Sequence, residues 1–212
     1  MQETLEPKIF SQLTKHSGNW LIMNSVSVEI NGKLIIDYEY VDRPASKQHN
    51  KSLDAVSMVP IIKSSKNHNR KVVVIANFRP PINKFILEFP GGKVESESIE
   101  DNAFRELKEE TGYIGHKILN KSDVICNYDA WKSKENGKLL IVEIDGDDER
   151  NQKPEQDLDE TEVIKVFVLD FDQNLVRTIE ELSEKHNFAV SDQLYSYTLG
   201  IATFSMLGIP FL

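Results

Sequence analysis

Apolar and polar residues alternate on both sides of an Asn31-Gly32 pair, over residues 21–42. This period of two is typical of strands with one buried face, and Asn-Gly between two such runs favours a β-hairpin turn. Short apolar stretches that are rich in β-branched residues predict more strands further along the chain. These expected strands cover residues 55–62, 70–78, 84–90, 138–144 and 163–169.

Residues 98–112 instead carry apolar side chains at helical spacing. Ser98 is expected to cap the first turn of this helix and Gly112 to end it. Strands mixed with helices, largely in hairpins, predict an α+β fold. Two further helices are expected over residues 174–186 and 191–206.

The length and composition are those of a globular protein, with 212 residues of which 40% are hydrophobic. This size suits one large domain, or one domain with a small extension. We expect a β-hairpin extension over residues 1–45, forming a small sheet, and one main domain over residues 46–212.

The net charge of −9 comes without a visible basic stripe, so no nucleic-acid partner is expected. No apolar run approaches the ~20 residues of a membrane span, and the start of the chain lacks a signal-peptide pattern. Cys126 is the one cysteine, which rules out an intrachain disulfide and favours a reducing compartment. The expected location is the cytoplasm, and a nuclear presence is also compatible with the sequence.

The expected helix over 98–112 carries three carboxylates, Glu106, Glu109 and Glu110, on neighbouring positions of one face. Like charges at this spacing destabilise an isolated helix, and Mg²⁺ is a hard cation that carboxylate oxygens satisfy. Arg105 stands four residues before Glu109 and can pair with it. A short motif of this kind is also common on solvated helix faces, which is the alternative interpretation.

The longer pattern is more specific. Glycine, carboxylate and arginine positions recur at fixed spacing over residues 91–113, and this segment closely resembles the Nudix box of hydrolases acting on nucleoside diphosphates linked to another group. The resemblance implies the Nudix fold, a mixed β-sheet sandwiched between helices. It also implies Mg²⁺, with Mn²⁺ as a substitute, bound by Glu106, Glu109 and Glu110 with the backbone carbonyl of Gly91. Glu97 and Arg105 would support these ligands.

Residues outside the box resemble the branch that hydrolyses ADP-ribose and ADP-sugars, which implies a homodimer with the N-terminal region exchanged across the interface and sites built from both chains. Trp20 matches a base-stacking tryptophan, and Tyr38, Glu39 and Arg43 match a segment that contacts the nucleotide. Arg79 is expected to bind phosphate, since a guanidinium contacts it in bidentate fashion. The alternatives are a half-buried hairpin aromatic for Trp20 and a strand-end salt bridge for Arg79.

The resemblance further implies a catalytic base on a loop before a late strand. Glu162 matches that position, and Glu160 is its competitor. The family's Pro-Gly element after the box is missing, and Trp131 stands in that region as an extra stacking surface, a lid anchor, or a loop aromatic packed on the core. The expected products are AMP and a sugar phosphate. Open alternatives are a UDP-sugar or dinucleotide pyrophosphatase, a nucleotide-sugar-binding module without catalysis, and an enzyme that removes damaged nucleotides.

Overall fold

The computed structural model describes residues 6–44, 53–67, 69–95 and 98–208. Its chain contacts divide the protein into two compact units. The expected boundary between residues 45 and 46 lies outside the described residues, so it stays a prediction. The first unit consists of residues 1–55, 94–96 and 124–137, and the second of residues 56–93, 97–123 and 138–212.

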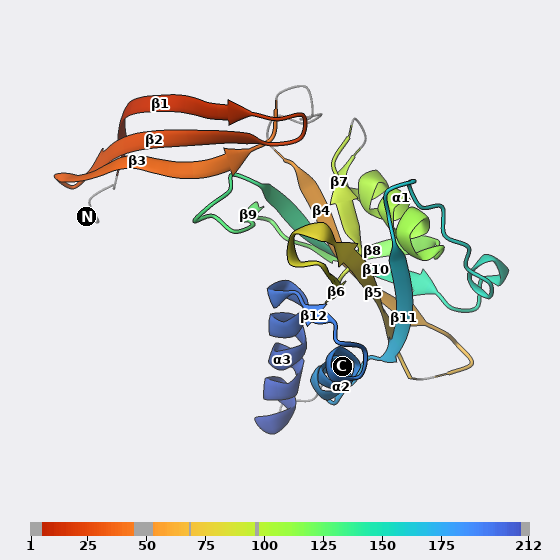
Figure 1. Ribbon diagram of the computed structural model, residues 1–212. Coiled ribbons are helices and arrows are strands. Elements are labelled where there is room, and N and C mark those ends of the chain that lie inside the picture. The colour runs from red at the N-terminus through yellow and green to blue at the C-terminus, as the bar shows by residue number, and fades with distance from the viewer. Residues whose placement is uncertain (1–5, 45–52, 68, 96–97, 209–212) are drawn as a thin grey trace. The chain divides into compact units, whose positions relative to one another are not determined.

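Three antiparallel strands form the small sheet of the first unit: β1 (Lys8–Ser17), β2 (Ile22–Ile30) and β3 (Lys33–Asp42) (Figure 1). Asn31 and Gly32 connect β2 to β3 with φ angles of 52° and 73°. Both positions of this tight turn therefore use the left-handed region that Asn and Gly tolerate best. The expected hairpin and the small N-terminal sheet are confirmed.

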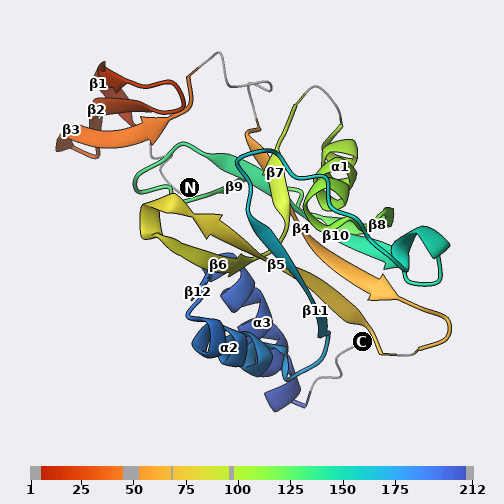
Figure 2. The same ribbon diagram turned by 45° about the vertical axis from the view of Figure 1, so that its right-hand side comes forward.

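A larger mixed sheet runs through the rest of the chain (Figure 2). In the described part of the chain its main path is β12-β6-β5-β4-β10-β8, while β11 pairs with β5, β7 with β4, and β9 with β10. The pair β12–β6 is parallel, while the pairs β5–β6, β4–β5, β11–β5, β10–β8 and β10–β9 are antiparallel. The strands are β4 (Ala55–Lys63), β5 (Lys71–Arg79), β6 (Lys84–Glu88), β7 (Gly91–Lys93), β8 (Gly115–Lys121), β9 (Cys126–Asn127), β10 (Asn136–Asp145), β11 (Ile164–Asp170) and β12 (Ala189–Val190).

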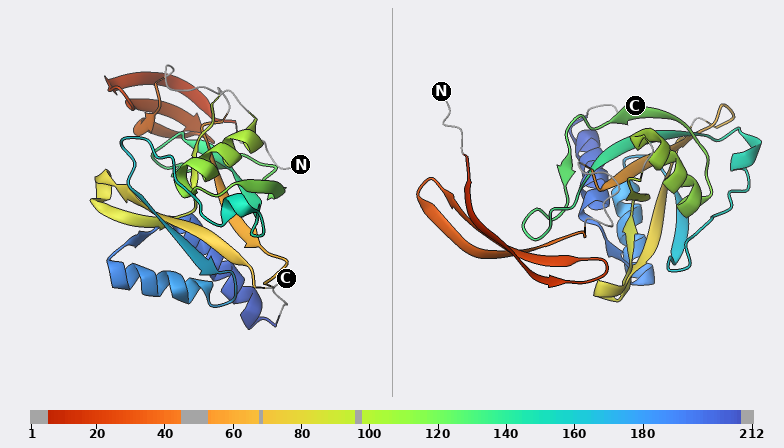
Figure 3. Two further views of the ribbon diagram at one scale, coloured as in Figure 1. Left: turned by 90° about the vertical axis from the view of Figure 1, so that its right-hand side faces the viewer. Right: turned by 90° about the horizontal axis from the view of Figure 1, so that it is seen from above.

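The α-helices of the described residues are α1 (Ile99–Thr111), α2 (Leu175–His186) and α3 (Asp192–Met206). Helices α2 and α3 cover one face of the sheet, where their apolar residues share a core with alternate positions of β5 (Figure 3). Because successive strand residues point to opposite faces, the intervening β5 residues face the other side. No helix among the described residues has the length and apolarity to cross a membrane.

Helix α1 begins and ends where the sequence predicts. The Ser98 hydroxyl accepts a hydrogen bond from the backbone N–H of Asp101 at 3.1 Å, which satisfies one free donor of the first turn. Gly112 adopts a φ of 78° and closes the helix through its N–H to the carbonyl of Lys108. Both ends of the acidic helix are therefore fixed by local sequence.

Candidate active site

Two of the three helix carboxylates lie on the buried face of α1. Glu106 and Glu110 are 9% and 3% exposed, and they share that face with Ala103 and Leu107, which are fully buried. Glu109 is half-buried instead. The alternative interpretation of this motif, a solvated acidic face, therefore does not describe Glu106 and Glu110. Burying carboxylates without compensation is costly, so these two positions call for an explanation.

Strand β7 places two glycines, Gly91 and Gly92, against those two carboxylates. The N–H of Gly91 donates a hydrogen bond to Oε2 of Glu110 at 2.8 Å. A Cβ at Gly92 would overlap the carboxyl group of Glu106, and a Cβ at Gly91 would overlap the carbonyl oxygen of Val56. The absence of a side chain at Gly92 therefore leaves room for the Glu106 carboxyl group, and its absence at Gly91 lets β7 lie against the backbone of β4.

Arg105 contacts two members of the acidic group, which consists of Glu106, Glu109 and Glu110. Its Nη2 donates to Oε1 of Glu106 at 2.9 Å and to the carbonyl of Lys93 at 3.2 Å, and its Nη1 donates to Oε2 of Glu109 at 2.7 Å. The expected pairing of Arg105 with Glu109 is confirmed. The guanidinium links helix α1 to strand β7 and holds two carboxylates in fixed orientations.

Burial shifts the ionisation of both buried carboxyls. Burial raises the pKa of Glu110 to about 9, against the opposing effect of the Gly91 N–H. Burial also raises the pKa of Glu106 to about 7, although the Arg105 guanidinium works in the opposite direction. Neighbouring negative charge on Glu162 adds to the rise in both cases. These side chains therefore lie in an environment that calls for more positive charge than the protein supplies.

Glu162 lies on the loop before β11 and is half-buried, with its Oε2 accepting from the backbone N–H of Asp159 at 3.1 Å. Its charge acts on both Glu106 and Glu110, as their raised pKa values show. Glu160 is exposed and is not among the residues with the largest effects on the pKa of either carboxyl. The electrostatics thus favour Glu162 over its competitor.

Arg79 is paired with a carboxylate that the sequence alone gave no role. Its Nη2 donates to Oε1 of Glu88 at 2.6 Å, and the Glu88 side chain is 16% exposed while that of Arg79 is 51% exposed. The alternative of a strand-end salt bridge is thus observed. Burial raises the pKa of Glu88, and its charge in turn acts on Glu110. A charged residue inside the apolar strand KFILE was the available signal for this pair.

The acidic group has the chemistry of a divalent-cation site. It offers buried, hard oxygen donors whose negative charge is only partly neutralised, which is what Mg²⁺ needs. Within the described residues, no three His, Cys, Asp or Glu side chains form a group that could hold a metal ion as they stand. In this structure Arg105 engages Glu106 and Glu109, while Gly91 engages Glu110. Glu97, an expected supporting residue, lies outside the described part of the chain.

The expected nucleotide-contacting residues belong to the first unit. Trp20 and Tyr38 are 58% and 43% exposed, which leaves the Trp20 alternative of a half-buried aromatic unsupported. Glu39 is exposed as well, and Arg43 forms an ion pair with Glu135. Trp131, in the same unit, is 68% exposed, so the interpretation of it as an aromatic packed on the core is wrong.

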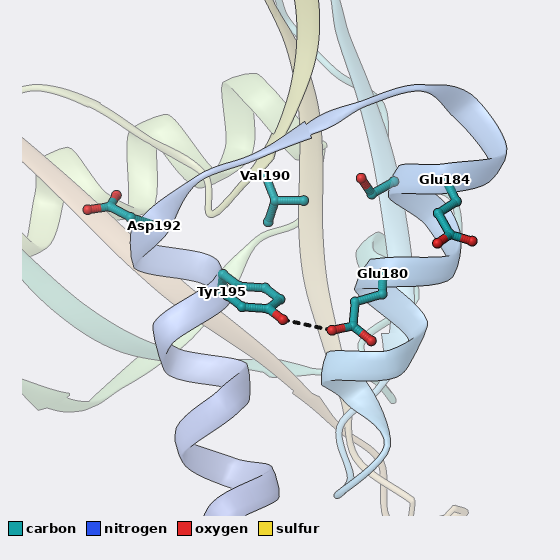
Figure 4. A pocket seen from close by; sticks show the side chains of 6 residues that line it. Glu180, Glu184, Val190, Asp192 and Tyr195 are labelled. Atoms are coloured by element: carbon teal, nitrogen blue, oxygen red, sulfur yellow. Dashed lines mark hydrogen bonds between the residues drawn. The ribbon is translucent and has the colours of Figure 1, made fainter.

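An open pocket with a volume of about 580 Å³ lies between α2 and α3 (Figure 4). The Tyr195 hydroxyl donates to Oε1 of Glu180 at 2.7 Å beside it. Because its lining carries acidic groups and no basic one, this pocket is unsuited to a phosphate-bearing substrate. Its lining residues are Glu180, Ser183, Glu184, Val190, Asp192 and Tyr195.

Comparison with known proteins places these features in a family. Residues 52–189 match the family model of the NUDIX domain. An uncharacterized Nudix hydrolase of Schizosaccharomyces pombe is 33% identical over 206 residues, covering 95% of this chain and 96% of the relative. The ADP-sugar pyrophosphatase of Mus musculus is 34% identical over 165 residues, covering 76% and 74%.

One more relative and one solved structure are also similar to this chain. The ADP-ribose pyrophosphatase of Saccharomyces cerevisiae is 36% identical over 116 residues, covering 54% of this chain and 49% of the relative. A solved structure described as an ADP compounds hydrolase superposes with a TM-score of 0.61 at 16% identity, covering 99% of this chain and 100% of that one. This likeness confirms the expected α+β fold with a mixed sheet and helices. The chain therefore belongs to the Nudix family of hydrolases.

Proposed function

We propose that this protein hydrolyses the pyrophosphate of ADP-ribose or related ADP-sugars, giving AMP and a sugar phosphate, in a reaction that depends on Mg²⁺. The observation that carries the proposal is the pair of buried carboxylates, Glu106 and Glu110, held against the glycines of β7. The relatives named ADP-sugar pyrophosphatase and ADP-ribose pyrophosphatase support the choice of substrate.

Mg²⁺, or Mn²⁺ in its place, would be held by Glu106, Glu109 and Glu110 with the carbonyl of Gly91, and it supplies positive charge for the pyrophosphate and acidifies water. The chain's own part is to hold those carboxyl groups in place and in a fixed orientation. Arg105 does this by fixing Glu106 and Glu109. Helix α1 orients Glu110 through its hydrogen bond with Gly91 of β7.

Glu162 acts as the general base in this proposal. Its carboxylate takes a proton from the attacking water, the water oxygen bonds to one phosphorus, and the bond from that phosphorus to the bridging oxygen breaks. The bridging oxygen leaves with the other phosphate. A carboxylate beside the cation that the site would hold is suited to accept a proton rather than to donate one.

Arg79 binds a phosphate of the substrate in the same scheme. Its guanidinium is half exposed, and Glu88 fixes it from the buried side through a single Nη2 contact. Planar nitrogen donors that remain accessible can contact phosphate oxygens in pairs. Glu88 is therefore a positioning residue for Arg79.

The nucleotide end is proposed to lie against the first unit. Trp20 and Tyr38 offer large, exposed aromatic faces, which stack on a base at little entropic cost. Glu39 and Arg43 belong to the same binding segment, as hydrogen-bonding and phosphate-contacting groups. The single cysteine further supports action in a reducing compartment, the cytoplasm, with a nuclear presence compatible.

A second copy of the chain is the proposed partner. Monomers rarely expose a contiguous apolar patch, yet strands β1 and β3 carry several large apolar side chains in the open. Pairing of two such sheets would cover them. A homodimer is the simplest symmetric assembly and would let one chain complete the site of the other. The exposed apolar residues of these strands are Ile9, Phe10, Leu13, Leu34, Ile35 and Ile36.

Hydrolysis in H₂¹⁸O across ADP-ribose, ADP-glucose, UDP-glucose and diadenosine diphosphate, with and without Mg²⁺, tests the proposal. We expect the highest kcat/KM for an ADP-sugar, products AMP and sugar phosphate, and no turnover after chelation. A preference for UDP-glucose or the dinucleotide would move the enzyme to another pyrophosphatase class. Tight ADP-ribose binding without AMP release would make the protein a binding module.

A further inference from the structure

The loop of residues 128–135 contacts the second half of β3 and the residue that follows it. The N–H of Val41 donates to the carbonyl of Lys132 at 2.8 Å, and the N–H of Lys134 donates to the carbonyl of Val41 at 3.3 Å. Arg43 and Glu135 form an ion pair at one end of the contact. The loop therefore moves with the strand segment proposed to bind the nucleotide.

At the other end of this contact, the Tyr38 hydroxyl donates a hydrogen bond to the backbone carbonyl of Trp131. Tyr38, which is proposed to stack on the base, is thus in contact with Trp131, the second tryptophan of the chain. Its phenol oxygen is the far tip of the ring, so the backbone of Trp131 lies at the outer edge of Tyr38. A substrate group that binds at Tyr38 is therefore beside the loop that carries Trp131.

The loop holds Trp131 out toward solvent. Asp129, with a φ of 48°, accepts at its carbonyl from the N–H groups of Lys132 and Ser133 and forms an ion pair with Lys132 at 2.9 Å. The Lys132 ammonium lies 5.1 Å from the centre of the Trp131 ring. The indole is nevertheless 68% exposed. An exposed indole on an ordered loop, beside a cation, suits an aromatic ring that bears phosphate.

We propose that Trp131 is a specificity-determining contact, an aromatic face that stacks on a planar ring of the substrate beside Tyr38. This inference rests on the proposed function and adds to it a residue outside the segment 91–113 and outside the Trp20 and Tyr38 pair. The substrate class that benefits most has a second planar ring, as in two nucleosides joined through a pyrophosphate. The enzyme would then accept such dinucleotides alongside ADP-sugars.

Kinetics of Trp131→Ala and Trp131→Phe with ADP-ribose and diadenosine diphosphate test the inference. We expect Trp131→Ala to raise KM for the dinucleotide roughly tenfold more than KM for ADP-ribose, the effect of losing one base stack, with little change in kcat. Trp131→Phe, which keeps an aromatic face, should restore most of the affinity. Val124→Ala is the matched control, since Val124 is 70% exposed on the preceding segment.

Fluorescence gives a readout that a merely structural role would not move. Trp20 and Trp131 are the two tryptophans of the chain, so Trp20→Phe leaves Trp131 as its only indole. Titration of that variant with a methylene-bridged diadenosine diphosphate analogue, which resists hydrolysis, should quench the Trp131 emission. Equal KM ratios in wild type and Trp131→Ala, without quenching, would overturn the inference. If the unmodified protein neither binds nor hydrolyses any of these substrates, the proposed function itself fails, and the inference with it.

Discussion

Gly92 and Glu106 lie so close that a Cβ on the glycine would overlap the glutamate carboxyl group. The two residues come from β7 and α1, and their contact closes one side of the acidic group. A metal-binding carboxylate needs both freedom from bulky neighbours and a fixed orientation. The glycine supplies the first of these and Arg105 the second.

Gly92→Ala is therefore expected to displace the Glu106 carboxyl and lower activity with a modest loss of stability, because a flexible side chain can yield. Gly91→Ala meets the Val56 carbonyl, which is backbone, and should cost about 1–3 kcal/mol of stability as overpacking does. Thermal unfolding and kcat measured side by side separate the two. An active Gly92→Ala enzyme would show that Glu106 tolerates displacement.

Gly200→Ala is the matched control for both variants. Gly200 lies inside α3 with no atom within 4 Å of an added Cβ. Alanine there should stabilise the helix by about 0.5–1 kcal/mol and leave activity unchanged. Loss of activity in this control would mean that the effects at positions 91 and 92 are not local.

The metal-free protein should lose stability as pH rises. The pKa of Glu110 is raised from 4.5 to about 9 by burial, so between these values the folded state binds more protons than the unfolded state. The free energy of unfolding therefore falls with increasing pH across that window. Thermal unfolding in a chelator at a series of pH values should show a steeper fall in wild type than in Glu110→Gln. Equal slopes would contradict a buried, protonated Glu110.

Mg²⁺ should reverse this trend, because it binds the ionised carboxylates. Its stabilising effect on wild type is expected to grow with pH and to be nearly absent in Glu110→Gln. Ca²⁺ and Mn²⁺ serve as comparison cations in the same unfolding assay. A Mg²⁺ effect of equal size in both proteins would place the cation elsewhere.

Glu162→Gln and Glu160→Gln form a matched pair on one loop. Loss of a general base typically costs roughly 10²–10⁴-fold in rate, and we expect that loss in kcat for Glu162→Gln only. Glu160 is exposed and is not among the main charges that act on Glu106 and Glu110, so its variant should resemble wild type. The reverse result would exchange the roles of the two residues.

The N-terminal sheet is expected to hold two copies together. Ile36 is 71% exposed and Leu13 is 55% exposed, so lysine at both positions should leave the fold of one chain intact while weakening self-association. Mass measured by light scattering during size-exclusion chromatography should fall from two chains to one. A wild-type mass of one chain would remove the dimer from the account.

Local sequence signals explain which parts of the fold were predictable. The β2–β3 hairpin and helix α1 are defined by nearby residues, a left-handed Asn31-Gly32 turn in one case and the Ser98 and Gly112 caps in the other. Strand β1 was not predicted as a strand because every residue in it is exposed, so no buried face marks it. Strand β8 is similarly exposed at most positions and is defined by its pairing with β10.

The site shows the same division. The carboxylates of α1 could be placed on one face from their spacing, but their burial depends on the approach of β7. The Arg79–Glu88 ion pair joins residues of two paired strands, β5 and β6, and the sequence pattern marks Glu88 as unusual without naming its partner. The Tyr38–Trp131 contact joins residues that are 93 positions apart. The partners in such contacts are set by tertiary structure and cannot be identified from local sequence.

Turnover of ADP-ribose by Glu110→Gln in saturating Mg²⁺, measured as AMP released, tests the central claim most directly. The amide keeps an oxygen that can accept from the Gly91 N–H and avoids burying a charge, so the variant should unfold no earlier than wild type in a chelator. We predict that kcat falls by orders of magnitude in a protein that is fully folded. Near-normal AMP release by folded Glu110→Gln would contradict the assignment of α1 as the catalytic cation site.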